Sequence, residues 1–196
     1  MKVLFATSNK KKVENAKRSM SKHGIEVEQV EVELTESRSF DPEVIAVEKA
    51  DQAFELLQKP VMVEDSGFFV NAIGEFPKTH VKFSLETLGI NNILKTLEGV
   101  KDRQAEWRMC VAYASGLHEH KLFTFIEPGE IAEAPREVKR DIMSDYWRIY
   151  IPKTDSGNKL ALSEMAEEDL AKWRKFNTER NQFDMLGRWL TEGKMD

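Results

Sequence analysis

The sequence has a single cysteine, Cys110, and no apolar run long enough to cross a membrane. One cysteine excludes an intrachain disulfide framework and is typical of a reducing compartment. The N-terminus also lacks the layout of a secretory signal peptide. We therefore expect a soluble, cytoplasmic protein that makes no use of a membrane.

The sequence also has no excess of basic residues, since 29 Lys and Arg residues stand against 34 Asp and Glu residues and the formal net charge is -5. A protein that binds polymeric nucleic acid usually presents a basic face, so we expect no such partner. The four histidines are His23, His80, His118 and His120. They stand without zinc-ligand spacing and without a serine or cysteine partner, which disfavours zinc sites and hydrolase triads.

Hydrophobic residues make up 41% of the 196 residues, enough for the core of one domain. Helix and strand patterns alternate in the first half, which favours an α/β fold with a mixed central sheet flanked by helices. A long antiparallel stretch in the second half predicts a second lobe. We expect one domain, with a core lobe over roughly residues 1–100 and 160–196, an antiparallel lobe over roughly 101–159, and a cleft between them.

The stretch from Val61 to Val70 is the centre of the functional prediction. Val61–Val63 is typical of a short buried strand, and Ser66-Gly67 favours a tight turn at its end. Glu64 and Asp65 are then expected just outside the carboxyl end of a strand, where open α/β sheets bind ligands. Adjacent carboxylates there suit a hard cation such as Mg²⁺. The alternative is a solvated acidic turn.

The first strand-to-helix junction carries hydroxyls, an amide and three lysines. A strand is predicted over Lys2–Thr7 and a helix from Lys10 to about Lys22. The start of a helix presents free N–H groups and the positive end of a dipole, which together favour an anion. The alternative is a solvated lysine run on a helix surface.

The remaining pattern is mostly regular. Asp41-Pro42 predicts the start of a helix that carries Lys49 and ends before Pro60. Two alternating segments, Gln104–Ser115 and Lys121–Ile126, predict a hairpin. An aromatic-rich strand is expected over 146–151, and two helices over about 163–176 and 178–192.

Several of these segments together resemble the inosine triphosphate pyrophosphatase family, also described as non-canonical purine NTP pyrophosphatases. Members of that family hydrolyse deaminated purine triphosphates to the monophosphate and pyrophosphate. Order and approximate spacing agree over nearly the whole chain. The segments are Thr7-Ser8-Asn9-Lys10-Lys11-Lys12, Glu36, Lys49-Ala50, Val63-Glu64-Asp65-Ser66-Gly67, Phe76-Pro77 with Lys82, Gly129-Glu130-Ile131 and Ser163-Glu164-Met165.

The resemblance implies a Mg²⁺ site, with Mn²⁺ as a substitute, held by Glu36, Asp65 and Glu64. Asp65 is also expected to orient or deprotonate the attacking water. The residues expected to bind the triphosphate are Thr7, Asn9, Lys12, Lys49 and Lys82, and Lys12 also counts among the catalytic residues. The partner is then a small nucleotide, and the family likeness implies a homodimer.

The base-reading region departs from the family pattern. Ser144-Asp145-Tyr146-Trp147-Arg148 stands where the family carries Gly-Trp/Tyr-Asp-Pro, and Arg174 with Thr178-Glu179-Arg180 replaces a lysine and Ser-His-Arg. The base-binding set expected here is Tyr146, Trp147, Arg174, Thr178, Glu179 and Arg180. Packing within the lobe is an equally good account of Tyr146 and Trp147.

An ionised Glu179 can only accept hydrogen bonds, so base preference is predicted to move toward an amino-bearing purine such as guanine. The alternative is that Glu179 pairs with Arg174 or Arg180 on a helix surface. The departures also leave a second function open. The chain could be a catalytically weak nucleotide-binding or sensing protein on the same fold.

Overall fold

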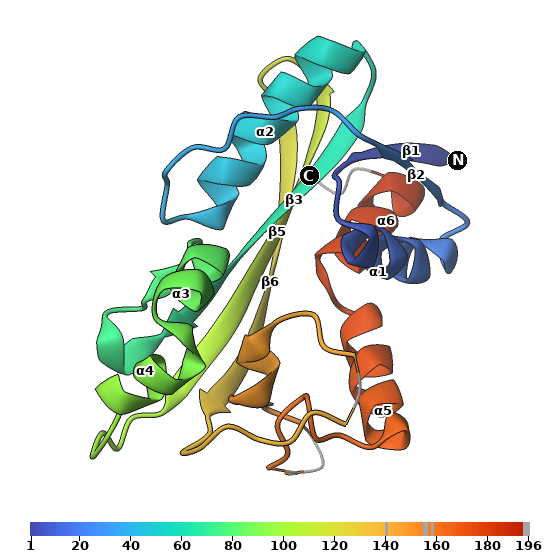
Figure 1. Cartoon of the computed structure of the whole chain (residues 1–196). Helices are drawn as coiled ribbons and strands as arrows, with labels where there is room; N and C mark the ends of the chain where they lie inside the picture. The colour runs from blue at the N-terminus through green and yellow to red at the C-terminus, as the bar shows by residue number, and fades with distance from the viewer. Residues whose placement is uncertain (140, 155–156, 158, 194–196) are drawn as a thin grey trace. The chain divides into compact units, whose positions relative to one another are not determined.

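The computed structural model describes residues 1–139, 141–154, 157 and 159–193 (Figure 1). No helix within those ranges combines the length and the apolar character that crossing a bilayer requires. In chain order the elements, where η marks a short 3-10 helix, are β1 (Lys2–Ala6), α1 (Lys10–Ser21), β2 (Glu26–Val30), α2 (Pro42–Leu57), β3 (Val61–Val70), η1 (Asn71–Ile73), β4 (Pro77–Lys78), α3 (Val81–Thr87), α4 (Gly89–Thr96), β5 (Gln104–Gly116), β6 (Glu119–Ile131), η2 (Asp145–Arg148), β7 (Tyr150–Pro152), α5 (Glu167–Thr178) and α6 (Gln182–Glu192).

The described strands form one 7-stranded sheet in the order β2-β1-β3-β5-β6-β7, and β4 pairs with β3 outside this path. β1 is parallel to both β2 and β3, whereas the β3–β4 and β6–β7 pairs are antiparallel. Parallel strands need a crossover, and here α1 and α2 supply it. The mixed sheet with helices confirms the predicted α/β fold class.

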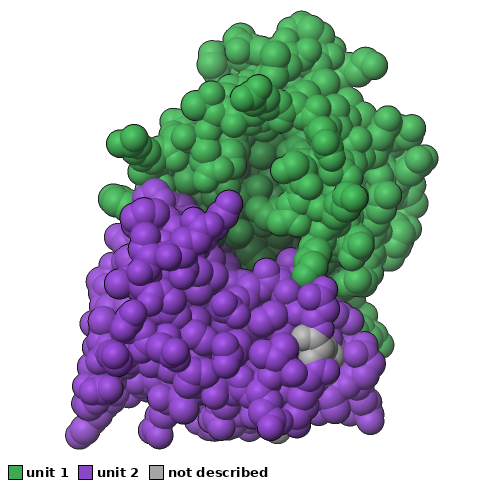
Figure 2. Space-filling view, viewed as in Figure 1, with its two compact units in different colours: residues 1–66, 109–125, 175–196 green, residues 67–108, 126–174 purple. Residues whose placement is uncertain are grey.

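The chain divides into two compact units, shown in different colours in Figure 2. The first unit comprises Met1–Ser66, Met109–Phe125 and Lys175–Asp196, and the second comprises Gly67–Arg108 and Ile126–Arg174. β3, β5 and β6 each contribute residues to both units. The lobe boundaries that we expected from the sequence stay a prediction.

In the first unit, different helices cover the two faces of the sheet because strand side chains alternate between the faces. Val3 and Phe5 of β1 belong to a buried cluster with residues of α1 and α6, two helices that lie side by side (Figure 1). The rings of Phe5 and Phe183 are 5.6 Å apart. Ala6 of β1 and Val63 of β3 belong to another cluster, with the alanines of α2.

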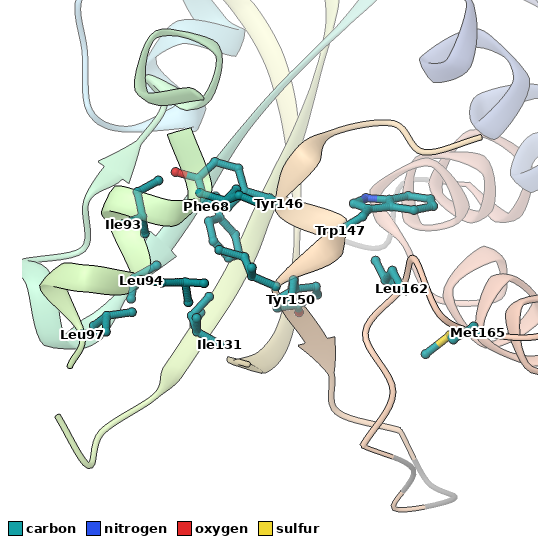
Figure 3. Close-up of a cluster of buried hydrophobic side chains, with 14 of the residues drawn as sticks. Phe68, Ile93, Leu94, Leu97, Ile131, Tyr146, Trp147, Tyr150, Leu162 and Met165 are labelled. Carbon is teal, nitrogen blue, oxygen red and sulfur yellow. The ribbon is translucent and has the colours of Figure 1, made fainter. Parts of the chain in front are cut away.

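In the second unit, the core is built around the fully buried Phe68 of β3 (Figure 3). The centroid of its ring lies 4.7 Å from that of Trp107, 4.6 Å from that of Tyr146 and 5.5 Å from that of Tyr150. α4 adds aliphatic side chains, of which Ile93 and Leu94 are labelled in Figure 3. Rings in tilted and edge-to-face contact stabilise such a core beyond their buried area.

The tight turn predicted at Ser66-Gly67 is wrong, because β3 runs without interruption to Val70. A Cβ atom on Gly67 would lie 2.8 Å from the backbone oxygen of Lys78. β4 approaches β3 closely here, with Phe68 paired to Lys78. The glycine therefore permits the close approach of two strands. In the sequence alone, such a strand glycine cannot be distinguished from a turn glycine.

Several predicted boundaries are confirmed and three are wrong, among them the start of the helix expected over about 163–176, which is α5 over Glu167–Thr178. α1 and α2 begin at the expected residues, with Asn9 and Asp41 as caps. The strand expected over 146–151 is instead η2 followed by the shorter β7. The last helix begins at Gln182 and not at 178, because the Asn181 side chain caps it by accepting the Asp184 N–H at 3.0 Å.

Candidate functional site

Glu64 and Asp65 lie inside β3 and not beyond its end, which corrects the position that the sequence predicted. The pairing of β1 with β3 joins Phe5 to Met62, and β1 ends at the next residue, Ala6, while β3 continues. The two carboxylates are thus located just past the carboxyl end of β1. Ligands of open α/β sheets bind beyond the carboxyl ends of parallel strands, so the general location still fits.

Glu64 and Asp65 direct their side chains to opposite faces of β3, because consecutive residues of a strand alternate. Glu64 Oε2 lies 2.6 Å from Lys12 Nζ of α1. Asp65 Oδ1 accepts a hydrogen bond from Lys49 Nζ of α2 at 3.1 Å. Both residues are buried, each with 7% of its surface exposed. Glu64 and Asp65 therefore do not form the expected pair of adjacent ligands. Each forms an ion pair with a lysine of the helix that covers its own face of the sheet, Lys12 of α1 or Lys49 of α2.

Lys49 joins the loop after β2 to this arrangement. Its Nζ atom lies 2.6 Å from Oε2 of Glu36 as well as 3.1 Å from Oδ1 of Asp65. Glu36 is largely exposed, whereas Lys49 is mostly buried. Two carboxylates that are far apart in sequence thus converge on one ammonium group, and their role as metal ligands stays a prediction.

The site stabilises the charged form of Lys12 and destabilises the charged form of Asp65. Burial raises the pKa of Asp65 above the ordinary aspartate value, and the nearby Glu64 adds to this against the opposing effect of Lys12 and Lys49. Burial acts to lower the pKa of Lys12, but the charges of Glu64 and Asp65 outweigh it, so the pKa is raised. Lys12 is therefore a cation at neutral pH.

The carboxylate oxygens fit a Mg²⁺ ion, because this cation takes oxygen ligands and keeps several waters. Glu36 and Asp65 already gather around one positive charge, and each has a second oxygen besides the one held by Lys49. Glu64 Oε2 is buried and receives no well-directed hydrogen bond, despite its proximity to Lys12. The donor set thus retains free acceptor capacity for a cation.

Thr7 and Asn9 shape the start of α1. The Asn9 side-chain oxygen accepts the N–H groups of Lys11 at 3.0 Å and Lys12 at 3.3 Å. Thr7 Oγ1 accepts the N–H of Asn9 at 3.2 Å. The Asn9 NH₂ group and the Thr7 hydroxyl hydrogen are the donors with which these side chains could meet a phosphate, and that role stays a prediction.

Three predicted site residues of the second unit differ in their exposure. Lys82 on α3 is 89% exposed, with Nζ 3.7 Å from Oε1 of Glu86. Tyr146 is fully buried and shares a hydrogen bond of 2.9 Å with the Ser84 hydroxyl. Trp147 is 7% exposed and meets Trp173 edge to face, with ring centroids 6.0 Å apart.

Figure 3 shows Tyr146 against Phe68 inside the core cluster of the second unit. This burial favours lobe packing as the account of Tyr146. A base-stacking role for Trp147 and a phosphate role for Lys82 stay predictions.

The α5–α6 turn holds the remaining predicted base-reading residues in the first unit. Thr178 is the last residue of α5, and Glu179 and Arg180 form the turn that follows. Glu179 is exposed and, among the residues that the structure describes, its carboxylate has no ion-pair partner. The Arg180 guanidinium stacks on Phe176, 3.3 Å from the ring centroid.

Arg174, the last predicted base-reading residue, belongs to the second unit and pairs with Glu167 at 3.5 Å. The structure therefore does not support the alternative that Glu179 pairs with Arg174 or Arg180.

A buried carboxylate that the sequence did not indicate fastens this turn. Asp184 Oδ1 lies 2.6 Å from Lys22 Nζ, and the same ammonium donates to the backbone oxygen of Thr178 at 2.8 Å. Arg188 donates to the other Asp184 oxygen and to the backbone oxygen of Glu179 at 2.8 Å. Asp184 thus positions two cations that each hold one carbonyl of the turn.

The charge of Asp184 is stabilised by this arrangement. Burial acts to raise its pKa, but hydrogen bonds from Lys22 and His23 and the charge of Arg188 outweigh it, so the pKa lies below the ordinary value. No local sequence pattern marks the network, because Lys22 and Thr178 are 156 residues apart.

Comparisons with known proteins agree on one family. A family model described as the Ham1 family matches residues 3–175. A protein named dITP/XTP pyrophosphatase from Methanopyrus kandleri is 36% identical over 187 residues, which cover 90% of this chain and 98% of the relative. A protein of the same name from Hyperthermus butylicus is 35% identical over 191 residues, covering 97% and 95%.

Solved structures show the same fold. The Staphylococcus aureus Ham1 protein matches with a TM-score of 0.76 and 20% identity, over 99% of this chain and 100% of that one. A HAM1 protein from Coxiella burnetii matches with a TM-score of 0.79 and 19% identity, over 98% and 100%.

Proposed function

The chain belongs to the Ham1 family, and on that premise we propose that it is a nucleoside triphosphate diphosphatase. Its reaction is the hydrolysis of a purine (deoxy)nucleoside triphosphate to the monophosphate and pyrophosphate. The observation that carries the proposal is the bridge that Lys49 forms between Glu36 and Asp65. Close relatives are named for the hydrolysis of the non-canonical triphosphates dITP and XTP.

This geometry suits a reaction whose barrier comes mainly from the negative charge of the triphosphate oxygens. Attack on a triphosphate builds charge on oxygens that already repel a nucleophile, so catalysis depends on positioning and charge neutralisation. Lys12 and Lys49 each lie beside a nearly buried carboxylate and are ordered by it. In the proposal the two ammonium groups also bind phosphate oxygens of the substrate. Thr7 and Asn9 donate hydrogen bonds to the phosphates at the start of α1.

Glu36 and Asp65 are the proposed metal ligands, whereas Glu64, on the opposite face of β3, acts in the proposal by holding Lys12. A Mg²⁺ ion held by Glu36 and Asp65, or Mn²⁺ as a substitute, would neutralise phosphate oxygens. Asp65 also takes the proton of the attacking water in the proposal. Its environment supports this role, since the raised pKa makes Asp65 a stronger base than an ordinary aspartate.

We assign the choice of base to the α5–α6 turn. Glu179 is exposed, and in the described part of the chain its carboxylate is not taken up by an ion pair. A carboxylate accepts hydrogen bonds from N1–H and the 2-amino group of guanine, and Arg180 can donate to a keto oxygen. These groups support a preference for an amino-bearing purine such as guanine over inosine.

Pyrophosphate release from GTP, dGTP, ATP, ITP, dITP and XTP, with and without Mg²⁺ or Mn²⁺, tests the function. We expect metal-dependent release of pyrophosphate and no release of single phosphates. Nucleotide binding without turnover would contradict the proposal and support the sensing protein instead. The proposed homodimer is tested separately by sedimentation velocity at micromolar concentration, where a pure monomer would overturn it.

A further inference from the structure

A second group of ligand-type side chains lies in the first unit, away from the residues assigned to the nucleotide. Asp51 belongs to α2, His118 to the two-residue turn between β5 and β6, and His120 to the start of β6. His118 Nδ1 lies 2.9 Å from Asp51 Oδ2, and His120 Nε2 lies 2.8 Å from Asp51 Oδ1. One ligand atom from each of the three residues falls within 4.8 Å of the others.

From this geometry we propose that Asp51, His118 and His120 bind a divalent transition metal ion, with Zn²⁺ as the best-fitting example. Two imidazole nitrogens and one carboxylate oxygen are donors that Zn²⁺ accepts in a tetrahedral arrangement. Neighbouring ligand atoms around such an ion are about 3.3 Å apart, given bonds of about 2.0–2.1 Å. The two imidazole–carboxylate contacts of 2.9 and 2.8 Å therefore need to lengthen by only about half an ångström to admit the ion.

The exposure of the cluster leaves room for a fourth ligand. The side chain of His118 is 77% exposed, whereas those of His120 and Asp51 are each 18% exposed. A water molecule can therefore complete the coordination from the His118 side. The cluster is half-buried on its other side, which limits the number of competing waters.

The charge state of Asp51 also suits a metal ligand, which must be deprotonated. Burial acts to raise the pKa of Asp51, but the hydrogen bonds from His118 and His120 outweigh it, so the pKa is lowered. The simpler account is a hydrogen-bonded contact that fastens the hairpin to α2. The backbone N–H of His118 already does this by donating to Asp51 Oδ1 at 2.9 Å. The hairpin is thus held on α2 without the two imidazoles, whose contacts with the same carboxylate are not needed for that purpose.

The proposed metal site is separate from the proposed Mg²⁺ site. Asp51 and Lys49 are two residues apart on α2, which places their side chains about 200° apart around the helix axis. Mg²⁺ prefers oxygen ligands and does not compete well for imidazoles. Zn²⁺ binding at this cluster is therefore independent of the nucleotide reaction.

The test is a calorimetric titration of EDTA-treated protein with Zn²⁺ alone, in the presence of millimolar Mg²⁺. We expect one Zn²⁺ per chain, with affinity weakened at least about tenfold in His118→Ala and in His120→Gln. His80→Ala, which removes a histidine of the second unit, is the matched control and should bind as the parent does. Because His118 is exposed, its removal should leave the circular dichroism spectrum unchanged.

Thermal unfolding provides a second readout that does not depend on heats of binding. Zn²⁺ at about a hundred times the Kd of the parent should raise the Tm of the parent by about 5 °C and that of the two cluster variants by about half as much or less. Absence of binding near one ion per chain would overturn the proposal. Equal affinity in the parent and both cluster variants would overturn it as well, since the ion would then bind elsewhere.

Discussion

Lys49 Nζ lies 3.1 Å from Oδ1 of Asp65, and this bond links α2 to the middle of β3. The same ammonium group holds Glu36, so one lysine bridges two of the carboxylates proposed for the metal. A substrate that brings its own cation would compete with Lys49 for these oxygens. The lysine would then be released to face the phosphates, which fits a site that is organised before the nucleotide arrives.

The first prediction is that turnover requires the carboxylate of Asp65. Asp65→Asn should keep the fold, because the amide has the same shape, and lower kcat by at least about a hundredfold. Steady-state pyrophosphate release measures this, and Asp102→Asn at an exposed position is the control. A folded Asp65→Asn protein with near-normal kcat would remove Asp65 from the mechanism.

The second prediction concerns the stability that Lys12 contributes. Lys12→Ala leaves the nearly buried Glu64 without its cation, so we expect a loss of roughly 3 kcal/mol in the free energy of unfolding. Urea unfolding measures it, with Lys17→Ala on the exposed side of α1 as control. The double variant Lys12→Met with Glu64→Gln should recover much of the loss. If Lys12→Ala costs no more than the control, the ion pair does not stabilise the fold.

The third prediction is a displaced acid limb in the pH profile. The pKa of Asp65 is raised above 3.8, so protonation removes the base at a higher pH than for an ordinary aspartate. kcat/KM should therefore fall as pH decreases toward this raised pKa, and be constant above it. A profile of kcat/KM at constant ionic strength checks this. An acid limb at or below pH 3.8 would contradict the assignment.

The fourth prediction concerns Asp184 and the turn that it fastens. Asp184 has a lowered pKa, so its contribution to stability is present above the ordinary aspartate pKa and lost as pH falls through the folded value. Asp184→Asn should lower the free energy of unfolding by about 1–3 kcal/mol near neutral pH, with a smaller difference in acid. Urea unfolding of both proteins across pH measures it. A pH-independent difference would show that the Asp184 charge is not the cause.

The same variant should affect the nucleotide as well, because Lys22 and Arg188 hold the backbone of the α5–α6 turn through Asp184. We expect a rise in KM with a smaller change in kcat. Lys22→Met, which also loses the bond to the Thr178 oxygen, should behave alike. An unchanged KM in both variants would separate the turn from substrate binding.

The fifth prediction is that Glu179 sets the ranking of bases. The parent should prefer GTP or dGTP over ITP by roughly tenfold in kcat/KM, since the 2-amino group of guanine, which inosine lacks, can donate to the Glu179 carboxylate, and a hydrogen bond to a charged group is worth about 1.5–3 kcal/mol. Glu179→His should move the ranking toward ITP and XTP, because a histidine can donate to a keto oxygen. Glu192→His on α6 is the control. A parent that already prefers ITP or XTP, or an unchanged ranking in the variant, would contradict this role.

The sequence by itself determined the elements whose causes are local. Asn9 and Asp41 cap α1 and α2 through hydrogen bonds to N–H groups two or three residues away, so the helix starts follow from short spacings. The alternation around Trp107 predicts β5 for the same reason, because side chains of a strand repeat every second residue. The likeness to the family rests on short motifs in order, and it too needs no contact between distant residues.

Only the tertiary structure decided which side chains meet. Glu64 and Asp65 are neighbours in sequence, yet the pleat of β3 sends them to opposite faces, where different helices supply Lys12 and Lys49. The approach of β4 explains Gly67, which has the local signature of a turn. The Asp184 and Asp51 clusters join segments far apart in the chain. Such contacts depend on strand register and helix packing, which are set by the burial of the whole core and not by any short stretch of residues.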